Sequence, residues 1–271
     1  DMKGYPGVTT ATRKDGTLYY RSSITISNRH ISLGSFDRLE KASAAYQTAC
    51  SIMRDHQYHI PDYSPSLALD FSKFIILINY RDNGLYFKTP IYLHKSYFYY
   101  YLTPEQYFIF DREDLFFYAT HQIQSRGGYY FVCDYGSQYS ILSRYGIHNY
   151  SKKGIDYAFV NQNEMDFRYE NIRVINDYMG VNERQDLSPA CYESIIHVRG
   201  NYLVGRYDDP ITAAIAYNKA VDCLTQNGFT KKYIKNYITT YNSAQYHERY
   251  QAIPISPKIG QLQPDKHQKK D

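Results

Sequence analysis

Alternating polar and apolar positions predict that the chain begins with a small antiparallel sheet. Residues 19–26 alternate between the two kinds of side chain, which is the period of a β-strand. Turn sequences bound this strand, Lys-Asp-Gly at 14–16 and Asn-Arg at 28–29. A third strand carries the apolar face through Ile31, and we expect it to end at Gly34.

A helical pattern follows these three strands. Apolar side chains recur on one helical face up to about Arg54, namely Leu39, Ala42, Ala45, Tyr46, Ala49 and Met53. Asp37 is the expected N-cap, because Glu40 three residues later completes a capping box. Residues 7–54 therefore predict three strands followed by one helix.

The same order of strand, glycine, aromatic residue and helix recurs near the other end of the chain. Five residues have counterparts at one offset of 171 positions: Gly34, Phe36, Ala45, Tyr46 and Ala49 match Gly205, Tyr207, Ala216, Tyr217 and Ala220. Matches at a single offset indicate an internal repeat. We expect residues 7–54 and 180–227 to form the same three-stranded antiparallel sheet with one helix.

The part between the repeats has a different pattern. Residues 71–93, FSKFIILINYRDNGLYFKTPIYL, are predicted to be strand-like. The aromatic run at 97–101 is predicted to lie in a core or an interface, in preference to a base-stacking platform. Residues 159–176, FVNQNEMDFRYENIRVIN, predict a tight polar loop followed by a strand end, a turn and a short helix. Beyond the second repeat, 237–259 predict a short helix, and 260–271 are expected to be disordered.

Charge and composition narrow the function. The net charge is +4, with +3 in residues 1–60, −2 in 61–178 and +3 in 179–271, so the two ends are the candidate phosphate-facing parts. No apolar run of 18 residues and no signal-peptide pattern occur, which predicts a cytoplasmic protein.

The cysteines and histidines predict no metal site and no cofactor. Four cysteines are scattered without CxxC spacing, which suits a reducing compartment and buried thiols: Cys50, Cys133, Cys191 and Cys223. The histidines form no set with metal-ligand spacing.

Both repeats resemble the ERF-type (APETALA-two) DNA-binding domain. The marks are GYPGV, ISLGSFD and ASAAYQTA in the first copy, and LVGRYDD and AAIAYNKA in the second. The resemblance implies that each sheet docks in the major groove of double-stranded DNA, where base pairs show distinct donor and acceptor patterns.

The polar loop resembles the ββα-metal finger of HNH homing endonucleases. The matching positions are Asn161, Asn163, Asp166, Arg168, Glu170, Asn171 and Arg173. The family's metal-binding aspartate, however, falls on Ala158, its general-base histidine on Phe159 and the asparagine that orients the base on Phe167. Metal-assisted phosphodiester cleavage needs a base and several oxygen ligands, and of the family's set only Asn171 still offers one. The resemblance thus implies a scaffold without catalytic or metal-binding residues.

These observations predict an α+β protein in which two ERF-type domains flank a degenerate HNH-like domain. The expected division is 1–60, 61–178, 179–236 and a C-terminal helix and tail at 237–271. The predicted function is non-catalytic, sequence-specific binding of double-stranded DNA by a nucleoid-associated transcriptional regulator. Two alternatives remain open: a residual HNH-type DNA endonuclease or nickase that uses other residues, such as Asp156 with His148, and a structural RNA-binding or assembly protein.

The predicted DNA contacts lie on the outer faces of the two sheets, at their turns and on the finger. They are Arg13, Lys14, Tyr19, Arg21, Ser23, Thr25, Arg29, His30, Arg168, Arg173, Arg184, His197, Arg199 and Arg206. Glu193 falls on the same face of the second sheet. For Arg168 and Arg173 the alternative is an internal salt bridge to Glu170 or Asp166.

Overall fold

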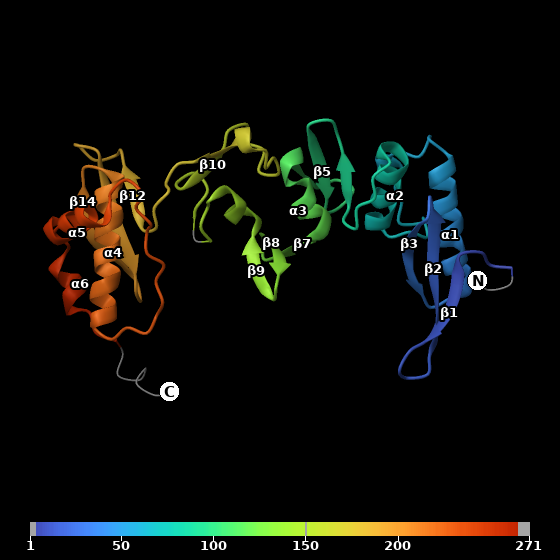
Figure 1. The fold of residues 1–271 in the computed structure, drawn as a ribbon, viewed down its shortest axis with the longest axis horizontal. Coiled ribbons are helices and arrows are strands. Elements are labelled where there is room, and N and C mark those ends of the chain that lie inside the picture. Colours follow the sequence, from blue (N-terminus) through green and yellow to red (C-terminus); the bar gives the residue numbers. More distant parts are fainter. Residues whose placement is uncertain (1–3, 150, 265–271) are drawn as a thin grey trace. The chain divides into compact units, whose positions relative to one another are not determined.

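A computed structural model describes residues 4–149 and 151–264 of the chain (Figure 1). The chain divides into two compact units: residues 1–141 with 159–172, and residues 142–158 with 173–271. The chain therefore passes three times from one unit to the other.

The first unit begins with the predicted sheet. Strands β1 (Val8–Thr12), β2 (Leu18–Ile26) and β3 (Arg29–Phe36) pair antiparallel in sequence order. Helix α1 (Leu39–Arg54) packs on one face of this sheet through Ala42, Ala45, Ala49 and Ile52. The other face carries the polar positions of β2, as the alternation predicts.

Gly34 does not end the third strand. Ser22 pairs with Gly34 but Ser23 pairs with Ser32, so Leu33 is an extra residue in a β-bulge. Gly34 has a φ of +136°, which glycine adopts without strain, and the strand continues to Phe36. The glycine thus marks a bulge within the strand.

Asp37 does not cap α1. The N-cap residue is Arg38, which makes no side-chain capping bond, and the Asp37 carboxylate instead accepts from the Lys41 ammonium at 3.4 Å. Asp37 lies one residue too early for its oxygen to reach the free N–H groups of the first turn.

The predicted strand-like run at 71–93 is mainly a helix. Helix α2 (Phe71–Asn83) buries every residue from Phe74 to Asn79 and ends at Gly84, whose φ is +69°. A run this apolar on all sides has no period that distinguishes a buried helix from a buried strand. The helix packs against α1 and β4 (Ile91–Leu93), and its apolar side chains belong to the same core as those of α1, β2 and β3, which accounts for a helix at this position.

The rest of the first unit holds two small antiparallel sheets and one short helix. Strands β4 (Ile91–Leu93), β5 (Tyr97–Tyr101) and β6 (Tyr107–Asp111) form one sheet, followed by α3 (Leu115–Thr120) and a sheet of β7 (Ile123–Arg126), β8 (Tyr129–Asp134) and β9 (Ser137–Ser140). Phe98, Tyr100 and Tyr101 of the aromatic run are buried, which confirms the predicted core position.

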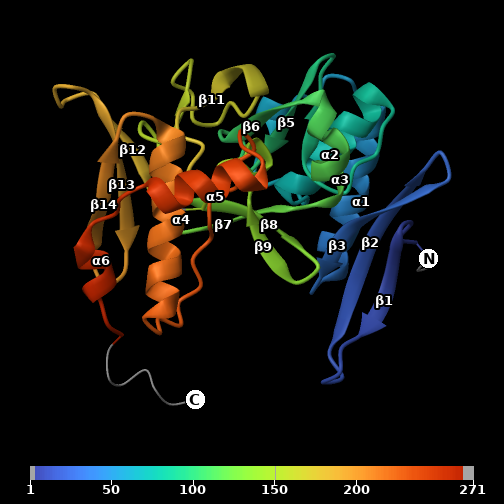
Figure 2. The ribbon, with the colours of Figure 1, turned by 60° about the vertical axis from the view of Figure 1, so that its left-hand side comes forward.

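The second unit contains the second copy of the repeat. Strands β12 (Val181–Arg184), β13 (Cys191–His197) and β14 (Asn201–Tyr207) form an antiparallel sheet, and α4 (Pro210–Gln226) packs on it (Figure 2). Helices α5 (Ser243–Ala252) and α6 (Pro257–Gln261) pack against α4. Gly260 and Gln261 of the predicted disordered tail therefore lie in a helix, while residues 265–271 fall outside the described residues.

The two copies share unusual details. Gly7 and Gly180 both have φ near +72°, and a Cβ there would lie 2.0 Å from the Tyr46 ring or 2.3 Å from the Tyr217 ring. The second sheet repeats the bulge, because Ser194 pairs with Gly205 and Ile195 with Leu203. The buried hydroxyls of Ser22 and Ser194 also correspond, and neither has a hydrogen-bond partner among the described atoms.

These shared details confirm the α+β fold class and the predicted sheet-and-helix pattern at both ends of the chain. The first copy places its glycine, strand pairing, bulge and helix in the same order as the second.

The polar stretch between the copies departs from the expected finger. Strands β10 (Tyr157–Phe159) and β11 (Ile172–Val174) pair, with one turn of 3-10 helix, Tyr169–Asn171, before β11. No α-helix follows β11 before β12 begins, although residues 175–180 are all described. The expected helix of a ββα finger is therefore missing.

The cysteine prediction is wrong in its detail. All four cysteines are free thiols, but none is fully buried: Cys133 is exposed and the other three are half-buried.

The length and apolar character of the helices decide whether any of them could span a membrane. Within residues 4–149 and 151–264, no helix combines the length and the apolar character needed to cross a membrane.

Candidate nucleic-acid interface

The outer face of the first sheet, opposite α1, carries small polar side chains and cations. Strand pairing sets these side chains in rows across the sheet: Thr9, Arg21 and Ser35; Ala11 and Tyr19; Ser23 and Ser32; Thr25 and His30. Arg21 and Thr25 are exposed, whereas Ser22 and Ile24 between them are buried toward the helix. The face therefore offers hydroxyl, imidazole and guanidinium groups from neighbouring strands.

Arg21 is held in place by the ring two residues before it. The Tyr19 hydroxyl accepts from Arg21 Nε at 3.1 Å and from Nη2 at 2.5 Å, and the guanidinium carbon lies 5.3 Å from the Tyr19 ring centre. Arg13 approaches the same ring, at 5.6 Å. Since only the Nε and Nη2 edge is used, the Nη1 edge of Arg21 remains for another acceptor.

The remaining cations of the first copy lie at its turns. Arg13 and Lys14 belong to the β1–β2 hairpin, and both are exposed. Arg29 begins β3 and lies 5.2 Å from the Tyr86 ring centre, with exposed His30 beside it. Among the described residues, none of these cations forms an ion pair with a carboxylate.

The second sheet presents a different outer face. Pairing puts Asn182, Glu193 and Arg206 in one row, so Glu193 occupies the position that Arg21 holds in the first copy. Glu193 accepts from Arg184 and from Arg206, each at 2.8 Å, and Arg184 also binds Asp186 at 2.6 Å. Two cations are thereby neutralised by two carboxylates.

The ion pairs of this cluster lower the pKa values of its two carboxyl groups. Burial opposes ionisation of Glu193, but hydrogen bonds from Arg184 and Arg206 outweigh it and hold the pKa of this carboxyl below its ordinary value. The hydrogen bond from Arg184 lowers the pKa of Asp186 to about 2. At neutral pH the cluster is therefore ionised and has no net charge.

His197 and Arg199, predicted on the outer face and hairpin of the second sheet, have contacts within their own unit. The His197 ring lies 2.9 Å from Asn201 Oδ1, and the His197 carbonyl accepts from Lys231 and Tyr233, each at 3.1 Å. Arg199 donates to the Gln263 carbonyl at 3.0 Å. The middle row of this face is apolar, with Ile195 opposite Leu203.

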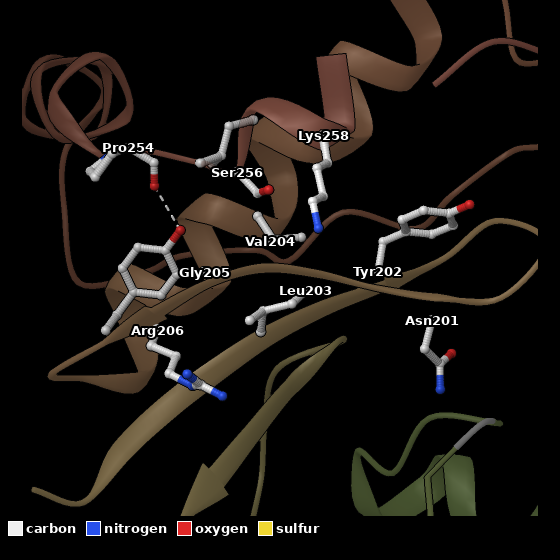
Figure 3. A pocket seen from close by; sticks show the side chains of 11 residues that line it. Asn201, Tyr202, Leu203, Val204, Gly205, Arg206, Pro254, Ser256 and Lys258 are labelled. Atoms are coloured by element: carbon white, nitrogen blue, oxygen red, sulfur yellow. Dashed lines mark hydrogen bonds between the residues drawn. The ribbon is translucent and has the colours of Figure 1, made fainter. Parts of the chain in front are cut away.

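The C-terminal segment lies along the free edge of this second sheet (Figure 3). The Ser256 amide donates to the carbonyl of Val204, the bulge residue, and the Tyr207 hydroxyl donates to the Pro254 carbonyl, each at 2.7 Å. A groove of about 550 Å³ remains between β14 and this segment, lined in part by Lys258. The segment covers part of an edge that would otherwise be open to strand addition.

The finger is closed by its own hydrogen bonds. Asp166 accepts from Asn161 Nδ2 at 2.8 Å and from Arg168 through two side-chain bonds, at 2.9 and 2.7 Å. Asn171 is buried, its Oδ1 accepts from the Asn161 amide and its Nδ2 donates to the Asp166 carbonyl. The side chains of Asn171 and Asp166 are therefore used in hydrogen bonds that hold the loop closed.

Arg168 and Arg173 differ in their contacts. Arg168 pairs with Asp166 at 2.7 Å and with Glu170 at 3.5 Å, which is the internal salt bridge of the alternative interpretation. These contacts raise the pKa of the Arg168 guanidinium above its usual range, chiefly through the hydrogen bond to Asp166. Arg173 is exposed, and no described carboxylate pairs with it.

The two groups of the nickase alternative, Asp156 and His148, line one pocket of the second unit. The Asp156 carboxylate accepts from the Lys152 amide and from Asn176. Among the described residues, no three His, Cys, Asp or Glu side chains lie close enough together to hold a metal ion.

Thr9 and Ser35 lie on the outer face but are not among the predicted DNA contacts. Both flank Arg21 in its row. Their own strands show no alternation strong enough to place them, and only the pairing register brings them to this face.

Comparison with known proteins gives no family for this chain. No protein-family model matches it, and no curated protein or solved structure matches it either.

Proposed function

We propose that this protein binds double-stranded DNA through the outer face of its first sheet, without cleaving it. The observation that carries the proposal is the row of Thr9, Arg21 and Ser35, in which Tyr19 orients an exposed arginine between two hydroxyls. Arginine is the commonest side chain for bidentate contact with guanine in the major groove, and serine and threonine contact several bases.

The charge around this row supports contact with a polyanion. Arg13, Lys14 and Arg29 lie at the ends of the strands, and they are not paired with described carboxylates. Cations at such positions would contact phosphates and fix the register of the sheet on the duplex. The first copy is therefore the proposed reading element.

The second copy supports the assignment by contrast. Its arginines at the corresponding face are neutralised by Glu193 and Asp186. We therefore assign it a lesser part in DNA affinity than the first copy, and the two-sided contact expected from the sequence becomes an unequal one. The closed network of Asp166 and Asn171 supports the non-catalytic part of the proposal. Such a protein would lie on the nucleoid.

Binding-site selection on random duplex DNA, followed by fluorescence anisotropy on the selected duplex, tests the proposal. Arg21→Ala should raise the Kd for the selected duplex about 5- to 150-fold, the cost of about 1–3 kcal/mol for losing a base contact. Arg54→Ala is the matched control, since it removes one exposed cation from α1 of the same copy. It should change the Kd less than about two-fold.

Three results would contradict the proposal. Equal effects of the two substitutions would show that only net charge matters. Unchanged binding by Arg21→Ala would remove the outer face as the contact. Tighter binding to an RNA hairpin than to any selected duplex would favour the RNA-binding alternative.

A further inference from the structure

The second unit contains a pocket that the proposed DNA contact does not use. Its volume is about 460 Å³, within the range of small-molecule sites. Its wall comes from five parts of the unit: His148 with Ser151, Lys152, Ile155 and Asp156; Asn176 with 178–182 at the start of β12; Ile195, His197 and Asn201 of β13 and β14; Tyr217 of α4; and 231–234. All of these residues belong to the second unit, so the pocket lies within one compact body.

Hydrogen bonds fix the wall on the side of Lys152. The Asp156 carboxylate accepts from the Lys152 amide at 2.7 Å and from Asn176 Nδ2 at 3.2 Å. The Asp156 carbonyl accepts from the amides of Ile175 and Asn176, at 2.8 and 3.0 Å, and Asn176 also donates to the Val181 carbonyl. The segment 152–156 is thereby tied to the chain that enters β12.

The pocket has an excess of cations. Lys152, Lys231 and Lys232 line it, and Asp156 is the one carboxylate among its described lining residues. Two N–H donors already use the oxygens of that carboxylate. Lys231 donates to the His197 carbonyl, while Lys152 and Lys232 are exposed and pair with no described carboxylate. An anion in the pocket would meet ammonium groups that no carboxylate neutralises.

The remainder of the lining is apolar or aromatic. Val181 is buried, Ile195 is half-buried, and the rings of Tyr178 and Tyr217 belong to the same wall. Such surfaces favour a hydrophobic or planar body over a fully hydrated ion. We propose that this pocket binds a small organic anion, with its carboxylate or phosphate near Lys152 and Lys232 and an aromatic or aliphatic body over the apolar wall.

Two dyes of the same shape test the proposal on the full chain. 8-Anilinonaphthalene-1-sulfonate carries a sulfonate, and N-phenyl-1-naphthylamine is its neutral counterpart. The double substitution Lys152→Gln with Lys232→Gln should raise the Kd of the sulfonate about five-fold, as expected for two solvent-exposed cations, and leave the neutral dye nearly unchanged. Lys258→Gln is the matched control, because Lys258 lines the other groove of the same unit. It should leave both dyes unchanged.

Competition then identifies the preferred anionic group. Phenyl phosphate or benzoate should displace the sulfonate dye, whereas phenol should not. The anion that displaces the dye at the lower concentration carries the preferred group. Equal displacement by phenol, or an equal effect of Lys258→Gln, would overturn the proposal.

A competition experiment with duplex DNA distinguishes this pocket from the proposed DNA contact. Displacement of the dye by duplex DNA would overturn the proposal, since the pocket would then belong to the nucleic-acid surface. Arg21→Ala should leave dye binding unchanged, so the two proposals fail by different results.

Discussion

Glu193 occupies in the second sheet the position that Arg21 occupies in the first. Both residues stand one position before a buried serine, Ser194 or Ser22, that pairs with the glycine of the bulge. Arg206 likewise stands in the second sheet where Ser35 stands in the first, so Glu193 has an arginine partner in its own row and Arg21 has no carboxylate in its row. The repeat therefore conserves the backbone and changes the chemistry of the outer face.

Tyr19→Phe should loosen sequence preference more than affinity. The change removes the hydroxyl that accepts from Arg21 Nε and Nη2 but keeps the ring beneath the guanidinium. We expect about a five-fold loss of binding to the selected duplex, near 1 kcal/mol for one oriented hydrogen bond, and little loss on a scrambled duplex. Tyr20→Phe, on the helix side of β2, is the control. Equal losses on both duplexes would show that Tyr19 does not orient a base contact.

Glu193→Gln should reduce the pH dependence of stability. The folded pKa of Glu193 lies below its ordinary value, so its ionisation stabilises the fold above the unfolded pKa of about 4.3. This stability is lost as the pH falls below about 4.3 and through the folded pKa. Because Arg184 and Arg206 are partly exposed, we expect the wild type to lose roughly 1 kcal/mol more than the variant between pH 6 and 3.

Urea unfolding across that pH range measures the difference. Parallel curves for the wild type and Glu193→Gln would contradict the ionised cluster.

Gly7→Ala and Gly180→Ala should each destabilise the protein by more than about 2 kcal/mol. Both positions have positive φ, and the new Cβ would also meet the ring of Tyr46 or Tyr217 and a backbone carbonyl. Gly16→Ala separates the two effects, because its φ is +84° but no atom lies within 4 Å of the added Cβ. It should cost only about 1 kcal/mol in chemical unfolding. Equal costs at Gly7 and Gly16 would show that the tyrosine contact is relaxed without penalty.

Asn171→Ala should destabilise the first unit by about 2–3 kcal/mol, because it leaves the part-buried Asn161 amide and the buried Asp166 carbonyl without their partner. Glu170→Ala, at a side chain that is 77% exposed, should have little effect. Thermal unfolding with and without Mn²⁺ extends the test. We expect the same Tm in both, and a Tm raised by Mn²⁺ only when Asn171 is present would show that the loop binds metal.

The sequence by itself determined the elements whose pattern has one physical solution. Alternation over 19–26 placed β2 and its two faces, since successive strand side chains point to opposite sides. The spacing of the alanines placed α1, and the offset of 171 positions located the second copy. These features depend on residues near each other in the chain.

Tertiary structure decided the rest. The apolar run at 74–78 is part of a helix that packs against α1 and β4, in a core that also holds side chains of β2 and β3. Asp166 and Asn171 match the nuclease pattern in sequence, and only the fold of the loop shows that both are hydrogen-bonded to other residues of the same loop. Only the pairing register shows that Arg21 and Glu193 occupy equivalent positions of the two sheets. Register determines which side chains of separate strands meet on one face.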